Sequence, residues 1–183
     1  MKILIVVAHP DDEVLGMGGT IKKLANQGNE LKTIFLSTGI LARRPFSTKT
    51  GDKIFTEKFL DKVDKKLKKL RTDAKNAAKV LGVDEIDFMD FPDNEMDTIS
   101  NLQITKTIEN EITKFKPKVV YMPTKFDVNV DHQAVYNATV TATRPRKNSI
   151  VKEVISFEIP SSTEWYFPSE YSPNIFVDIT KEI

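Results

Sequence analysis

Short apolar runs that alternate with helical segments constrain the fold of this chain more than any other feature of its sequence. Residues 2–7 form a continuous run rich in β-branched side chains, which is typical of a strand buried on both faces. The same reasoning predicts strands at residues 31–36, 86–89 and 118–122, and helices at residues 14–27, 57–81 and 99–115. Such alternation favours right-handed crossovers. We therefore predict a Rossmann-like α/β fold with a mostly parallel sheet flanked by helices.

A single domain is expected to span residues 1–183, because a chain of this length ordinarily forms one core. Residues 38–55 are predicted to form a loop, and its unusual length for a compact domain suggests a functional role. The helix at residues 57–81 is expected to be amphipathic, with at most one break, and to stop at Gly82. Late strands are predicted at residues 151–159 and 175–179, and an antiparallel orientation is left open for them.

Composition excludes several classes of site. The chain has no cysteine, so disulfides and thiolate metal ligands are both absent, and a metal must be held by histidine and carboxylate. A net charge of +1 argues against general affinity for nucleic acid. No apolar run approaches the roughly 20 residues of a transmembrane helix, and the first run is too short for a signal peptide. We therefore expect a cytoplasmic protein, for which a homo-oligomer is compatible with the sequence.

Two segments invite nucleic-acid or nucleotide interpretations that the residues disfavour. The lysines between Lys58 and Lys79 are interleaved with acidic residues, which is typical of a solvated helix face. Gly16, Gly18 and Gly19 follow the first strand, but the dinucleotide-binding spacing would need glycine where Ile21 stands. Close packing of the helix is the better account of these glycines.

The only two histidines each follow a predicted strand and lie beside carboxylates. His9 begins the sequence HPDDE after the first strand, and His132 ends the sequence DVNVDH after the strand at residues 118–122. In a parallel sheet both segments leave at the carboxyl ends of the strands, where ligands bind. Two segments far apart in the sequence could therefore converge on one ion.

A catalytic zinc site commonly has three protein ligands and an open position for water, and His9, Asp12 and His132 can supply such a set. Asp11 would then lie beside the metal, where it could accept a proton from water as a general base. Alternatively, Asp11, Asp12 and Glu13 cap the following helix at its positive end. Spacing alone does not separate these interpretations.

Several motifs together resemble the PIG-L (LmbE-like) deacetylase family. They are AHPDDE at residues 8–13 with GGT at 18–20, RTD at 71–73 with Ala77, LGV at 81–83, FPD at 91–93, and DVNVDH at 127–132. The motifs occur in order over nearly the whole chain, so the resemblance is specific.

The resemblance implies a zinc-dependent N-deacetylase with one Zn²⁺ per chain, held by His9, Asp12 and His132. It also implies that Asp11 is the general base. Arg71 is expected to contact an amino-sugar substrate, although a helix-surface arginine is the alternative interpretation. We further expect Asp131 to tune the electrostatics of His132 without binding the metal.

The chain departs from the commoner family pattern at two places. Asn129 stands where the second motif usually has histidine, and it can donate a hydrogen bond to an oxyanion but cannot titrate near neutral pH. Asn129, together with TRP at 143–145 and EIPSSTEW at 158–165, resembles a branch of the family associated with surface-polysaccharide and nucleotide-linked sugar pathways. Arg144, which lies in the TRP segment, is therefore a second candidate for substrate binding. Family members also usually continue with another helix beyond a segment like residues 176–180.

These features lead to the hypothesis that the chain removes an acetyl group from the amide nitrogen of an N-acetylglucosamine-type sugar. One rival is a phosphotransferase with an aspartate nucleophile, but adjacent aspartates after a histidine suit zinc better than magnesium. The other rival is a catalytically silent paralogue that binds metal or sugar, which Asn129 and the short C-terminal segment favour.

Overall fold

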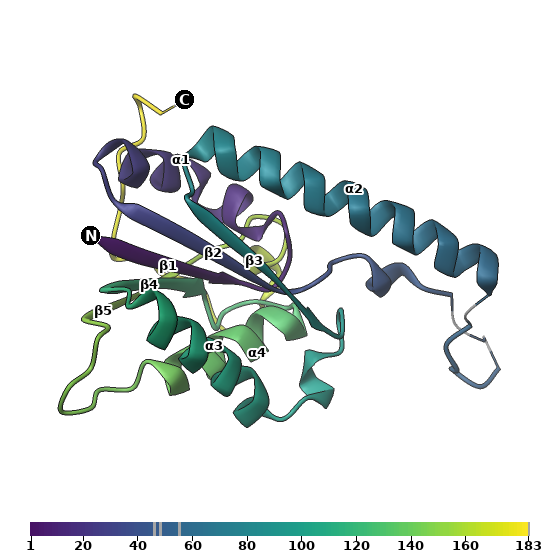
Figure 1. Ribbon diagram of the computed structural model, residues 1–183. Helices are drawn as coiled ribbons and strands as arrows, with labels where there is room; N and C mark the ends of the chain where they lie inside the picture. Colours follow the sequence, from purple (N-terminus) through teal and green to yellow (C-terminus); the bar gives the residue numbers. More distant parts are fainter. Residues whose placement is uncertain (46, 48, 55, 183) are drawn as a thin grey trace.

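The computed structural model describes residues 1–45, 47, 49–54 and 56–182, and it has an α/β architecture (Figure 1). The described residues contain one five-stranded sheet in the order β3-β2-β1-β4-β5, in which every pairing is parallel. The strands are β1 (Lys2–Val7), β2 (Glu30–Ser37), β3 (Glu85–Phe91), β4 (Val119–Pro123) and β5 (Glu153–Phe157). The α-helices are α1 (Asp12–Asn26), α2 (Glu57–Leu81), α3 (Asn101–Phe115) and α4 (Val130–Ala142). The predicted Rossmann-like parallel fold is confirmed.

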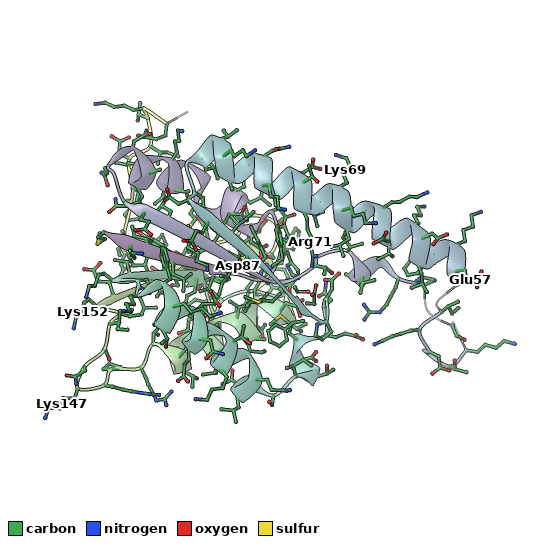
Figure 2. The ribbon with its side chains drawn as sticks, viewed as in Figure 1. Glu57, Lys69, Arg71, Asp87, Lys147 and Lys152 are labelled. Carbon is green, nitrogen blue, oxygen red and sulfur yellow. The ribbon has the colours of Figure 1, made fainter. Side chains whose placement is uncertain are left out.

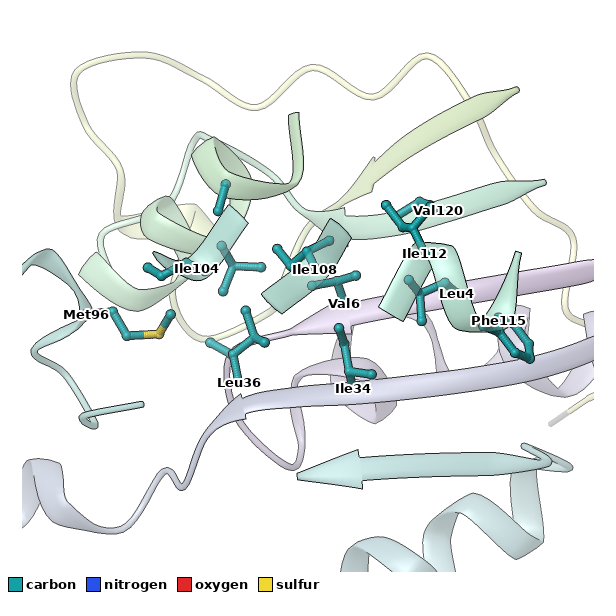
Figure 3. Close-up of a cluster of buried hydrophobic side chains, with 13 residues drawn as sticks. Leu4, Val6, Ile34, Leu36, Met96, Ile104, Ile108, Ile112, Phe115 and Val120 are labelled. Carbon is teal, nitrogen blue, oxygen red and sulfur yellow. The ribbon is translucent and has the colours of Figure 1, made fainter. Parts of the chain in front are cut away.

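Helices cover both faces of the sheet, which explains why β1 is apolar at nearly every position. Alternate side chains of β1 point to opposite faces. Leu4 and Val6 pack into a cluster with α3 and α4, whereas Ile3, Ile5 and Val7 pack into a second cluster with α1 and α2 (Figure 3 shows the first cluster). β1 pairs in parallel with β2 from Lys2↔Glu30 to Val7↔Phe35, so the two strands end side by side at their carboxyl ends.

Two glycines of α1 allow other parts of the chain to approach the helix closely. A Cβ added to Gly16 would lie 2.5 Å from the backbone oxygen of Glu158, and one added to Gly19 would lie 2.5 Å from Ile179. Close packing, which was predicted for three glycines, is therefore confirmed for Gly16 and Gly19 but not for Gly18, where an added Cβ would meet only Val14 at 3.8 Å. Gly82 ends α2 as expected, with a left-handed φ of 84° and its N–H bonded to the oxygen of Ala78.

The structure decides two points that the sequence left open, the continuity of α2 and the direction of β5, and it corrects one predicted strand. α2 is one unbroken helix of 25 residues, and in Figure 2 its first half, which carries Glu57 and Lys69, extends beyond the sheet. β5 runs parallel to β4, because the connection after α4 brings the chain back to the end of the sheet at which β4 begins. Residues 175–179 form no strand within the described chain.

The connection after β2 is long, as predicted. It runs to α2 and contains a short 3₁₀ helix, η1 (Leu41–Arg43); Phe46, Thr48 and Phe55, which the predicted loop includes, lie outside the described residues. Two further 3₁₀ helices are η2 (Met96–Thr98) and η3 (Thr163–Trp165). Among the helices that the structure describes, none combines the length and apolar character needed to cross a membrane.

Candidate metal centre

The strand order places the two histidines at the same point of the fold. β1 and β4 are neighbours, and the chain leaves β1 toward α1 on one face but leaves β4 toward α4 on the other. The crevice at the carboxyl ends of two such strands is where open α/β sheets bind ligands. His9 follows β1 and His132 lies in the first turn of α4, so both side chains reach this crevice.

His9, Asp12 and His132 form a buried cluster at this point. Asp12 Oδ1 lies 3.2 Å from His132 Nε2, and Asp12 Oδ2 lies 3.6 Å from His9 Nδ1. Each of the three residues offers one ligand atom, and these atoms lie within 4.8 Å of one another. The three residues that the sequence singled out are therefore brought together in a geometry that could hold a metal ion.

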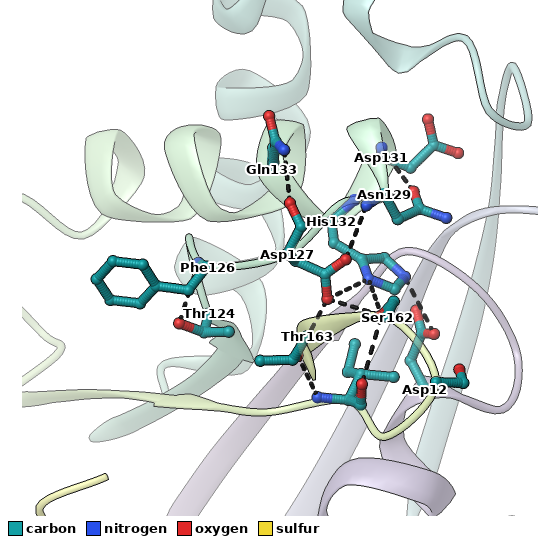
Figure 4. Close-up of polar contacts among 12 residues, drawn as sticks. Asp12, Thr124, Phe126, Asp127, Asn129, Asp131, His132, Gln133, Ser162 and Thr163 are labelled. Carbon is teal, nitrogen blue, oxygen red and sulfur yellow. Dashed lines mark hydrogen bonds and ion pairs between the residues drawn. The ribbon is translucent and has the colours of Figure 1, made fainter. Parts of the chain in front are cut away.

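Each histidine also has a carboxylate behind it, on the ring nitrogen that faces away from the cluster. Asp131 Oδ2 lies 3.0 Å from His9 Nε2, and Asp127 Oδ2 lies 3.0 Å from His132 Nδ1 (Figure 4 shows the second contact). A carboxylate in this position fixes the tautomer and the orientation of a metal-binding imidazole. The expectation that Asp131 acts on His132 is corrected here, since Asp131 contacts His9 and Asp127 contacts His132.

Both supporting carboxylates are themselves held in place. Asp131 accepts hydrogen bonds from the backbone N–H groups of Asn94 and Met96 at 2.7 and 3.0 Å. Asp127 accepts from the hydroxyls of Ser162 and Thr163 at 2.8 and 3.2 Å, both of which come from the segment after β5 (Figure 4). The orientation of the two histidines therefore depends on loops that follow β3, β4 and β5.

The carboxylates strongly change the protonation of the cluster. Burial alone would lower the pKa of His9, but hydrogen bonds with Asp12, Asp131 and Asp93 raise it to about 12. Burial is likewise outweighed at His132, where Asp12 and Asp127 raise the pKa to about 9. Burial would raise the pKa of Asp12, yet its two histidine partners hold that pKa well below its usual value. The cluster therefore attracts positive charge, which a divalent ion can supply in place of protons.

The donor set fits zinc. It consists of two imidazoles and one carboxylate, which are ligands that catalytic zinc commonly takes. Within the described chain, His132 Nε2 is buried without a hydrogen-bond partner although it faces Asp12, as expected of a nitrogen reserved for a ligand. The three residues thus form a candidate metal centre, and a cavity of about 500 Å³ opens over it.

Comparisons with known proteins agree with this geometry. The sequence pattern of the PIG-L family, described as GlcNAc-PI de-N-acetylase, matches residues 4–143. The chain belongs to the PIG-L family. This membership confirms the resemblance inferred from the motifs and speaks against the phosphotransferase alternative.

Three proteins show what this PIG-L chain is similar to. Diacetylchitobiose deacetylase from Thermococcus kodakarensis is 29% identical over 98% of the chain, which spans only 64% of the length of that relative. The structure of N,N'-diacetylchitobiose deacetylase from Pyrococcus horikoshii matches with a TM-score of 0.70 at 21% identity, over 98% of this chain and 64% of that one. The structure of 4-carboxy-2-hydroxymuconate hydratase from Pseudomonas putida matches with a TM-score of 0.72 at 25% identity, over 98% and 73%.

The two remaining catalytic candidates of this PIG-L chain line the cavity. Asp11 precedes α1, and its side chain makes no capping hydrogen bond to that helix. Asp12 also binds the backbone N–H of His9 at 2.8 Å instead of capping α1. Side-chain capping of α1 is therefore not found for Asp11, although Asp12 and Glu13 do lie in the first turn of that helix, at its positive end. Asn129 caps α4, with its side-chain oxygen accepting from Asp131 N at 2.8 Å and His132 N at 3.4 Å.

Neither predicted substrate-binding arginine lines the cavity. Arg71 Nη2 bonds to Asp90 at 2.6 Å, and its guanidinium lies over the ring of Phe88 (Figure 2 labels Arg71 on α2). Arg144 lies beyond the far end of α4, where it donates to the oxygen of Thr141 at 2.6 Å. A role of either arginine in substrate binding stays a prediction.

Sequence reasoning missed the groups that support the metal centre. Asp93 is buried and reaches within 3.5 Å of His9 Nε2, and Asp127 orients His132, but neither received a role. Both follow strands at their carboxyl ends, which is a signal that could have identified them. Ser162 carries no comparable signal, because it follows an irregular segment after β5.

Proposed function

We propose that this chain is a zinc-dependent hydrolase that removes the acetyl group from an N-acetylated amino sugar. The observation that carries the proposal is the buried cluster of His9, Asp12 and His132, in which each histidine is backed by a separate carboxylate. Family membership and the deacetylase activity named for the relatives support it. One zinc ion per chain is proposed, because the three ligand atoms can surround a single ion.

The bound ion would polarise the amide carbonyl and make a neighbouring water more acidic. Asp11 would accept the proton of that water; its place in the lining of the cavity, next to the proposed ligand Asp12, supports this role. Burial, together with the charge of Asp12, raises the pKa of Asp11, which makes its carboxylate a stronger base. After attack, Asp11 returns the proton to the nitrogen of the leaving amine, and acetate is released.

Asn129 supplies the second part of the proposed chemistry. Because its side-chain oxygen is engaged in capping α4, its amide NH₂ is the group free to face the cavity (Figure 4). An NH₂ group can donate a hydrogen bond to the oxyanion that develops on the carbonyl. Asn129 therefore stabilises charge but transfers no proton.

The test is acetate release by the zinc-loaded chain from free, nucleotide-linked and lipid-linked N-acetylglucosamine. Asp11→Asn preserves shape but cannot accept a proton, so kcat should fall by about 10²–10⁴-fold while zinc content stays near one per chain. Asp61→Asn, on the exposed part of α2, is the matched control and should keep full activity. Normal turnover by Asp11→Asn would remove Asp11 from the mechanism, and no release from any sugar by the zinc-loaded parent would favour a silent binding protein.

The hydratase that shares this fold at 25% identity supports a second candidate, the addition of water to a carbon–carbon double bond. The same cavity could activate water for either reaction. An unsaturated tricarboxylic acid of the kind named for that hydratase therefore belongs in the substrate panel, where its hydration without any acetate release would replace the deacetylase proposal.

A further inference from the structure

A smaller cavity, of about 260 Å³, lies beside the loop that connects β4 to α4. We call it the side pocket; its walls are that loop, α4 and the residues after η3. Each wall contributes one aromatic ring, from Phe126, Tyr136 and Tyr166. The rings of Phe126 and Tyr166 meet edge to face, with their centroids 6.3 Å apart. In Figure 4, Phe126 lies on the opposite side of Asp127 from the metal ligand Asp12, so the side pocket is separate from the metal centre.

One wall divides the side pocket from the cavity over the metal centre. Phe126 lines the side pocket and Val128 lines the metal cavity, while Asp127 is fully buried between them. The Asp127 carboxylate accepts a hydrogen bond from Ser162, which lines the metal cavity. Its backbone oxygen accepts from Gln133 Nε2, which belongs to the side pocket, at 2.6 Å. Molecules bound in the two cavities would therefore be neighbours.

The polar end groups of the side pocket take no part in holding the fold together. Gln133 uses its NH₂ group to bind Asp127, so Oε1 is the end left over, and it accepts no hydrogen bond from the described residues. Within the described chain the side-chain amide of Asn137 and the hydroxyls of Tyr136 and Tyr166 are likewise unbonded. The side pocket thus combines free donors and acceptors with aromatic rings.

This combination distinguishes between classes of ligand. Among the described residues that line the side pocket, Lys125 alone is charged, which suits neither a metal cation nor a ligand rich in phosphate. A purely apolar ligand would leave the amides and hydroxyls without hydrogen bonds. A sugar ring carries hydroxyls at its edge, which match the acceptor and donors of an amide, and C–H groups on its faces, which pack against aromatic rings. The lining therefore suits a sugar.

We propose that the side pocket is a second carbohydrate-binding site, which holds a sugar unit linked to the unit that is deacetylated. The inference rests on the proposed function for the position of the reacting unit. The shared wall favours one continuous ligand, because a sugar linked to the unit at the metal centre needs only to cross the wall around Asp127. A single amino sugar fills the metal cavity alone, whereas an oligosaccharide fills both.

The experiment compares N-acetylglucosamine with its disaccharides of different linkage on the zinc-loaded chain. Affinity is measured by calorimetry, which does not depend on turnover, and KM is measured by acetate release. One net hydrogen bond typically changes affinity by about fivefold, so the best-fitting disaccharide should bind roughly tenfold or more tightly than the single sugar. Equal affinity for the single sugar and for every disaccharide would overturn the inference, while acetate release would still support the proposed function.

Two variants locate the second site. Asn137→Ala removes an amide that makes no bond to the fold, and Tyr166→Phe removes a hydroxyl but keeps the ring. Each should reduce the preference for the disaccharide by about fivefold and leave affinity and KM for the single sugar unchanged. Asn26→Ala is the matched control, because Asn26 is an exposed helical asparagine that lines neither cavity, and it should keep the preference of the parent.

The remaining outcomes separate the inference from its alternatives. If no sugar loses acetate but the disaccharide preference depends on Asn137 and Tyr166, the proposed function fails and the second carbohydrate site stands. If the preference persists unchanged in both variants, the additional sugar unit binds elsewhere and the inference is wrong. A variant that weakens binding of the single sugar as much as that of the disaccharide would assign its residue a structural role, which also contradicts the inference.

Discussion

Replacing Asp127 by asparagine tests whether the carboxylate behind His132 controls metal binding. Asp127 is fully buried and accepts four hydrogen bonds, from His132, Ser162, Thr163 and the backbone of Asn129. Asparagine has the same shape, but one of its two acceptor atoms becomes a donor. If the amide NH₂ faces His132, the Nδ1 of that histidine must become an acceptor, and the proton then moves to Nε2, which faces Asp12.

A protonated Nε2 cannot bind metal, so the substitution should weaken zinc binding by a change of tautomer. Loss of such a supporting carboxylate typically lowers metal affinity by about 10–100-fold, which corresponds to roughly 1.4–2.7 kcal/mol. A buried donor left without its acceptor should lower the free energy of unfolding by a further 1–3 kcal/mol or so. Chelator competition measures the first quantity, and urea unfolding in the presence of a chelator measures the second.

The matched control is Asp84→Asn, which changes another structural carboxylate. Asp84 accepts from the backbone N–H of Leu31 at 2.8 Å, at the opposite end of the strands from the cavity. It should lower stability with zinc affinity unchanged. Wild-type zinc affinity in folded Asp127→Asn would refute the reasoning, because His132 would then keep its metal-binding tautomer without the carboxylate.

Three further predictions follow from the described contacts. Asp12 and Asp127 raise the folded-state pKa of His132 to about 9. In the presence of a chelator, the stability that protonated His132 contributes is fully present below pH 6.5 and is lost as pH rises toward 9, so urea midpoints should fall over that window. Excess zinc should remove or reverse this fall. Gly16→Ala places a methyl group 2.5 Å from the backbone of Glu158, so the free energy of unfolding should drop by about 1–3 kcal/mol in urea titrations. The control Gly18→Ala should be tolerated, because its methyl group meets only Val14, at 3.8 Å. Asn129→Asp keeps the capping oxygen but removes the amide donor, so thermal stability should hold while kcat falls by about 10²–10³-fold, and unchanged kcat would remove Asn129 from the chemistry.

The sequence predicted β1 and β2 well because both strands are buried on both faces, which leaves an uninterrupted apolar run with sharp ends. α4 was not among the predicted helices. Its polar residues Asp131 and His132 are buried at the site, while Val135 and Ala138 pack into the core, so apolar and polar positions do not separate onto two faces. Because α4 contributes residues to both the core and the site, its sequence lacks the 3.6-residue apolar periodicity from which an amphipathic helix is predicted.

The C-terminal segment shows the opposite error. Residues 175–179 form a short apolar run of the kind found in strands, yet no described strand pairs with them. Ile175 and Phe176 remain exposed and line a cavity of about 790 Å³ between α1, β5 and this segment. A pattern of apolar side chains indicates that a surface is to be covered, but it does not say whether a strand, another molecule or a substrate covers it.

The candidate metal ligands lie together as the sequence predicted, whereas the expected contact of Asp131 with His132 is not found, for a geometric reason. Asp131 and His132 are adjacent in sequence, and adjacent side chains on a helix point about 100° apart, so they cannot easily contact each other. Asp131 instead turns toward the loop after β3 and reaches His9, while His132 turns toward Asp127.

Asn129 shows how one residue can serve both folding and the proposed chemistry. The oxygen and nitrogen of a side-chain amide are assigned from their hydrogen bonds, and here the backbone N–H groups of Asp131 and His132 require the oxygen. The same hydrogen bonds cap the start of α4. They also orient the Asn129 side chain so that its amide nitrogen points away from the first turn of the helix. A donor whose direction is set by helix capping needs no reorganisation when negative charge develops, which is the property that makes such donors effective. The cap thereby ties the start of α4, and with it His132, to the position of the proposed oxyanion donor.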